Sequence, residues 1–75
     1  MKVFVAKTLV EDIDSNSCSV EVFGKLSDAK KFADEEIDSI AEEYNGNVTE
    51  RADFYYAMNS GDTYVTISIE EKEIN

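Results

Sequence analysis

One segment, residues 28–44, repeats its apolar side chains with the period of an α-helix, whereas the segments on both sides of it alternate with the period of a β-strand. Ser27 is the expected N-cap, and Asn45-Gly46 provides the C-terminal stop. Because no other segment repeats in this way, the sequence predicts a single helix. Its buried face is expected to comprise Ala29, Ala33, Ile37, Ile40, Ala41 and Tyr44, with Phe32 at the margin.

Two pairs of strand-like segments flank this helix. Residues 2–10 and 18–23 are rich in β-branched and aromatic side chains and are separated by the polar loop 11–17. Residues 50–58 and 63–70 form the second pair, with turn-like residues between them. The predicted fold is therefore α+β, in the order β-β-α-β-β, with an antiparallel four-stranded sheet and one helix packed on one face.

The sheet face that the helix leaves uncovered is also expected to be apolar. A single helix covers only one face of such a sheet, and the first strand carries apolar side chains on both faces. Closing the second hairpin at Ser60-Gly61 places Tyr56 opposite Val65 toward the helix, and Tyr55 and Tyr64 on the other face. An apolar patch of this size favours association. We expect a homodimer in which two such faces, or two edge strands, meet.

Charge and length exclude several classes of protein. Seventeen acidic residues against seven basic ones give a net charge of −10, whereas direct contact with nucleic acid or an anionic membrane requires a basic surface. Residues 1–75 suffice for one domain. The sequence contains no signal-peptide pattern and no long apolar run, which predicts a cytoplasmic protein without membrane contact.

Residues suited to catalysis or metal binding are scarce. The sequence has no His, and its one cysteine, Cys18, alternates with Val20 and Val22, which predicts a small core side chain. Residues 12–16 match the D-x-D-x-N opening of a calcium loop, but Ser17 and Phe23 stand where that loop needs glycine and a carboxylate. We therefore expect no enzyme activity, no catalytic residue, no cofactor and no metal.

The helix carries seven of the seventeen acids. The leading hypothesis is a non-catalytic, acidic protein–protein interaction module whose partner presents a basic surface. One alternative, based on size and charge only, is an inhibitor of the kind that phages and mobile elements encode, which mimics nucleic acid and blocks a restriction or CRISPR enzyme. A more distant one is a small-ligand or metal-binding domain. The acidic helix and the open sheet face are both candidate surfaces, with the residues Asp34, Glu35, Asp38, Glu42, Glu43, Tyr55 and Tyr64.

Overall fold

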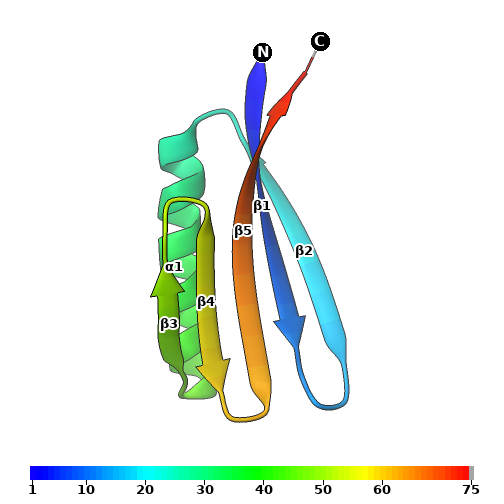
Figure 1. The fold of residues 1–75 in the computed structure, drawn as a ribbon, viewed down its shortest axis with the longest axis vertical. Coiled ribbons are helices and arrows are strands. Elements are labelled where there is room, and N and C mark those ends of the chain that lie inside the picture. The colour runs from blue at the N-terminus through cyan, green and yellow to red at the C-terminus, as the bar shows by residue number, and fades with distance from the viewer. Residues whose placement is uncertain (75) are drawn as a thin grey trace.

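The computed structural model describes residues 1–74 and consists of one helix on one face of a five-stranded antiparallel sheet (Figure 1). The elements in chain order are β1 (Lys2–Glu11), β2 (Asn16–Phe23), α1 (Leu26–Tyr44), β3 (Asn47–Arg51), β4 (Tyr55–Ser60) and β5 (Thr63–Glu73). The strand order in the sheet is β2-β1-β5-β4-β3. The first and last strands of the chain are thus neighbours at the centre, and β2 and β3 are the two edges.

The first hairpin and the helix confirm the sequence prediction, with small shifts in their ends. β2 begins at Asn16, because Asn16 pairs with Glu11 and extends the ladder into the predicted loop. The helix begins at Leu26, and the N-cap is Lys25, which has extended backbone and no side-chain capping bond. The predicted cap, Ser27, therefore lies inside the first turn. The helix ends as expected at Asn45, whose left-handed φ of 56° turns the chain so that the Gly46 N–H donates to the Ala41 carbonyl over 2.7 Å.

The predicted four-stranded sheet is wrong, because residues 50–58 do not form one strand. The chain turns between β3 and β4, and the Ala52 N–H donates to the Tyr55 carbonyl over 2.8 Å. The sequence signal for β3 is weak: Val48 is the only apolar residue in the strand, and a bulge between Val48 and Glu50 interrupts its alternation. Backbone pairing with β4 makes this segment a strand.

The register of the second hairpin differs from the predicted one by two residues. Tyr56 pairs with Ile67 and Met58 pairs with Val65. A shift of two preserves the face of every side chain, so the predicted faces are confirmed for Tyr55, Tyr56 and Tyr64. Phe54 was predicted to lie in this strand, but it falls in the turn before β4 and is 46% exposed.

The core lies between α1 and the middle of the sheet. Ala29 and Ala33 are fully buried on the helix, and their small side chains let α1 approach the strands closely. Tyr44, predicted for the same face, is 41% exposed at the last helical position. The buried apolar cluster comprises Ala6, Ala29, Ala33, Ile37, Ile40, Ala41, Tyr56, Met58, Val65, Ile67 and Ile69. No residue of β2 belongs to it.

Candidate interaction surface

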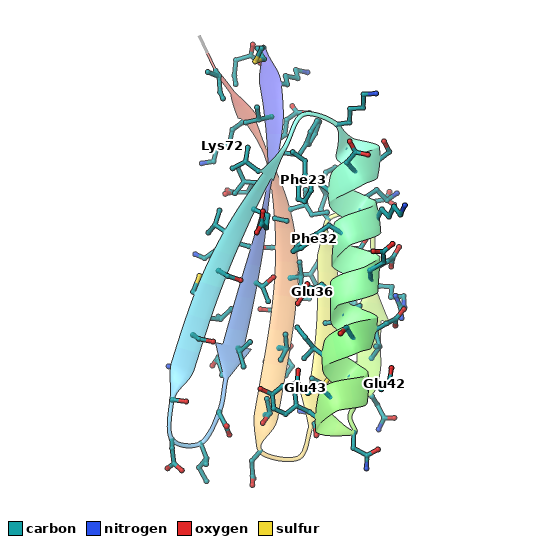
Figure 2. The ribbon with its side chains drawn as sticks, turned by 180° about the vertical axis from the view of Figure 1, so that it is seen from behind. Phe23, Phe32, Glu36, Glu42, Glu43 and Lys72 are labelled. Atoms are coloured by element: carbon teal, nitrogen blue, oxygen red, sulfur yellow. The ribbon has the colours of Figure 1, made fainter. Side chains whose placement is uncertain are left out.

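The strand β2 is the most exposed strand of the sheet. Seven of its eight residues are exposed, and only Phe23 at its end is half-buried. Phe23 lies against Phe32 of α1 with 5.3 Å between ring centroids, and the two rings point toward each other in Figure 2. From this contact β2 extends away from the helix, which lies behind β3 and β4 on the other side of the sheet in Figure 1. Both faces of β2 are therefore open along most of its length.

In the part of the chain that the structure describes, the outer edge of β2 carries backbone groups without a partner. Ladder bonds in an antiparallel pair alternate between opposite residues, and the Asp12 N–H bonds to the Ser15 carbonyl over 2.8 Å at the hairpin end. Counting from this pair, alternate residues from Ser17 to Phe23 bond to β1. The residues between them direct their N–H and C=O groups outward, and within residues 1–74 no backbone hydrogen bond reaches these groups: they belong to Asn16, Cys18, Val20 and Val22.

The same alternate residues place apolar side chains on the sheet face that lacks the helix. Val20 and Val22 are 54% and 59% exposed. Cys18 is also exposed, so its predicted place in the core is wrong: its side chain lies on the sheet face opposite to α1. Val5 lies opposite Val22, and Leu9 lies opposite Cys18. We call Val5, Leu9, Cys18, Val20 and Val22, with the outer backbone edge of β2, the β2 surface.

Tyr55 and Tyr64 also lie on the open face, and together they cover the part of it formed by β4 and β5. Their hydroxyl oxygens are 3.5 Å apart. Ala57, which lies between them on β4, is only 2% exposed although no helix covers it. The hydrogen bond with Tyr64, together with burial, raises the pKa of Tyr55 to about 12. The tyrosine pair is therefore a cover over β4 and β5.

Polar residues separate the tyrosine pair from the β2 surface. Across the sheet, Val20 lies opposite Lys7, Lys7 opposite Ser68, and Ser68 opposite Tyr55. Adjacent strands are about 4.8 Å apart, so the three steps span about 14 Å. The open face expected from the sequence is thus two regions, and the strongly exposed apolar one is the β2 surface.

The acidic helix face is partly neutralised. Arg51 of β3 bonds to Asp34 over 2.9 Å and also to Asp38, and the bond to Asp38 is the largest cause that raises the pKa of Arg51. Within residues 1–74, the remaining candidates form no ion pair: Glu35, Glu42 and Glu43 are exposed. Figure 2 shows Glu42 pointing away from the sheet, whereas Glu43 lies on the sheet side of the helix. The five predicted helix residues therefore do not form one uniform array.

Sites for small ligands or metals are not evident in residues 1–74. The described chain forms no pocket and brings together no group of three or more His, Cys, Asp or Glu side chains suited to a metal ion. In the loop that resembles a calcium site, the Asp12 carboxylate accepts the Ile13 N–H over 2.7 Å. In the same residues, no helix has the length and apolar character needed to cross a bilayer.

Sequence reasoning missed the β2 surface as a site. The alternation of Cys18, Val20 and Val22 predicts a core strand, but an exposed edge strand has the same pattern. A usable signal was the near absence of charge: apart from Glu21, no residue of β2 carries a charged side chain, and the strand has no proline. Comparisons of the chain with protein-family models, with curated proteins and with solved structures found no match.

Proposed function

We propose that this chain is a non-catalytic interaction module that binds another polypeptide through the β2 surface. The observation that carries the proposal is the combination found on β2: outward backbone groups that have no partner within residues 1–74, beside Val20 and Val22, which are more than half exposed. An extended segment added at such an edge gains main-chain hydrogen bonds from the backbone and selectivity from the alternate side chains. The tyrosine pair and the acidic helix are secondary in this proposal.

The chemistry of the chain supports a binding role over a catalytic one. The sequence has no His, and the ionisable side chains of the helix that form contacts pair with opposite charges at the surface, as Lys30 does with Asp53 over 3.0 Å. Such pairs favour the charged forms, and the pKa of Lys30 is raised by its bond to Asp53. General acid–base catalysis needs groups whose pKa lies near neutrality.

A mimic of nucleic acid is the second candidate, favoured by Glu35, Glu42 and Glu43, which are exposed and outside any ion pair in residues 1–74. Arg51 argues against it, because its guanidinium lies between two of the acids that such an array would use. The mimic requires a basic partner, whose affinity would fall steeply with salt. The β2 surface requires no such dependence.

The test compares immobilised wild type with matched variants for capture of proteins from lysate of the source cell. Val20→Lys and Thr49→Lys each place a lysine at an exposed β-branched residue of an edge strand, the first on β2 and the second on β3. We expect capture to fall at least about tenfold with Val20→Lys, because a charge is placed in the apolar contact. Capture should be unchanged with Thr49→Lys, and circular dichroism should show both variants folded.

Charge reversal and salt separate the two candidates. The double variant Glu35→Lys/Glu42→Lys should keep its captured partner if the β2 surface is the site, and moderate salt should have little effect on it. Capture that is lost in this variant and in high salt, but kept in Val20→Lys, would contradict binding at the β2 surface. It would favour mimicry of nucleic acid by the acidic helix. If the wild type captures no protein, including its own kind, the proposal is wrong.

A further inference from the structure

We infer that the polypeptide bound at the β2 surface is a second copy of this chain, and that the two β2 strands pair antiparallel with Val20 facing Val20 at the two-fold axis. The inference rests on the proposed function and names its partner. The product is one continuous ten-stranded sheet, with five strands from each copy. Four properties of β2 lead to this arrangement.

The first property is that the outward backbone N–H and C=O groups of β2 are complementary to the same groups of a second copy. With Val20 at the axis, each residue whose number is even faces a residue whose number is even, so Cys18 faces Val22 of the second copy. These are the residues that direct their N–H and C=O groups outward. Every facing pair of this set therefore exchanges two main-chain hydrogen bonds.

The second property is that this pairing places apolar side chains beside apolar ones and keeps the acidic side chains apart. An axis perpendicular to the sheet keeps the open faces of both copies on one side. Val20 then packs beside its own copy and Cys18 beside Val22, which doubles the apolar area of the β2 surface. On the other side, Glu21 faces Ser19 of the second copy, so the two acids do not oppose each other.

The third property is charge. Each copy carries −10, so the repulsion between two copies is smallest where they meet at a surface with few acids. β2 contributes one acid, Glu21, whereas the helix carries seven. Because α1 lies behind β3 and β4 in Figure 1 and contacts β2 at Phe23, near the end of the strand, this edge keeps the two acidic helices apart over most of their length.

The fourth property is closure. After the two β2 strands pair, the free edges of the joined sheet are the two β3 strands. β3 has five residues, a bulge, and the charged side chains Glu50 and Arg51. Short, bulged and charged edges resist further strand addition. The assembly therefore stops at two copies and does not grow into a filament.

The first measurement is the mass in solution by sedimentation equilibrium, with the full chain at concentrations up to roughly 100 μM. We expect twice the chain mass for the wild type and for Thr49→Lys, and a dissociation constant raised at least about 30-fold for Val20→Lys, because the change places two lysines opposite each other. A wild type that remains a monomer throughout this range overturns the inference.

The second measurement is disulfide trapping, which tests the register. In Cys18→Ser/Val20→Cys the two thiols lie on residues that face each other, with Cα atoms about 5.5 Å apart, which suits a disulfide. In the matched control, Cys18→Ser/Val22→Cys, the two cysteines are four residues apart along the strands, about 14 Å, and cannot bond. Val22→Cys with Cys18 retained should bond again, since residues 18 and 22 face each other.

We expect the first and third variants to form covalent dimers on mild oxidation at least about tenfold more than the control. Equal trapping of Cys18→Ser/Val20→Cys and the control overturns the pairing about Val20. Failure of this inference is distinguishable from failure of the proposed function. A monomeric wild type whose captured partner is lost with Val20→Lys keeps the proposed function and excludes self-pairing. A monomer whose capture does not depend on Val20 excludes both.

Discussion

The two edge strands of the sheet, β2 and β3, differ in how well they are protected against pairing with a further strand. β3 is short and bulged, and its Arg51 side chain is tied to Asp34 and Asp38 of the helix. β2 is longer and unbulged, and Phe23 is its only residue that is not exposed. Edge strands of stable monomers are usually blunted by bulges, charges or covering elements. The β3 edge has these features, and the β2 edge has almost none of them.

The difference extends to the open face beside each edge. On the β3 side, Tyr55 and Tyr64 meet over Ala57 and leave it 2% exposed. On the β2 side, no described residue covers Val20 and Val22 in the same way, and both stay more than half exposed. The open sheet face beside β3 is thus covered by side chains of the chain itself, whereas the face beside β2 is left exposed. In the proposed function, a second polypeptide covers it. If this comparison is right, changes beside β3 should alter the stability of the fold, whereas a change beside β2 should not.

The largest expected effect compares the glycines that adjoin the two edge strands. A Cβ at Gly46, just before β3, would lie 2.6 Å from the Met58 sulfur and 2.8 Å from the Asn59 carbonyl oxygen. Gly46→Ala should therefore lower the free energy of unfolding by about 1–3 kcal/mol. A Cβ at Gly24, just after β2, meets nothing within 4 Å, and Gly24→Ala should be neutral or stabilising by up to about 1 kcal/mol. Urea denaturation measures both, and equal losses would contradict the comparison.

A smaller effect is expected when the link between β3 and the helix is removed. Arg51→Met keeps the apolar stem of the side chain but loses both ion pairs. Because these groups are 41–61% exposed, solvent screening limits the loss to about 0.5–1 kcal/mol, and the loss should shrink in high salt. Lys72→Gln, which removes a looser pair with Glu70 at 3.7 Å, is the control and should cost less. Thermal unfolding at two salt concentrations measures the difference; a loss that grows with salt would count against the ion pairs.

The smallest effect concerns the tyrosine cover at high pH. The bond to Tyr64 is the largest cause that raises the pKa of Tyr55 to about 12, above the ordinary phenol value of 10.0. A phenol whose pKa is raised in the folded state stabilises that state below its unfolded pKa, and this contribution is lost as the pH rises from about 10 to about 12. Tyr64→Phe should lower the pKa of Tyr55 and weaken the loss of stability in that window. Spectrophotometric titration of the tyrosines checks this, and an unchanged titration would show that the hydroxyl contact is unimportant.

Much of the fold could be predicted because it is encoded over short distances. The alternation in β2 and β5 and the helical repeat from Ala29 to Ala41 predict which side chains share a face, and the structure confirms this grouping. For β5 and the helix it also confirms the face that is buried. The face assignment survived even the wrong register of the second hairpin, because the error was two residues and the period of a strand is two.

The interaction surface required the tertiary structure. Whether Cys18, Val20 and Val22 are buried depends on which face of the sheet α1 covers and on which strand lies at the edge. The edge position of β2 follows from the pairing of β1 with β5, strands from opposite ends of the chain, such as Val10 with Val65. That pairing is made by backbone hydrogen bonds, which are alike for every residue and leave no mark on the local sequence pattern. The sequence did not predict β3 for the same reason, because β3 is a strand through its backbone pairing with β4. The sequence by itself determined which side chains share a face, because that depends on local geometry; the tertiary structure decided which face is covered and which edge is free, because that depends on contacts between distant segments.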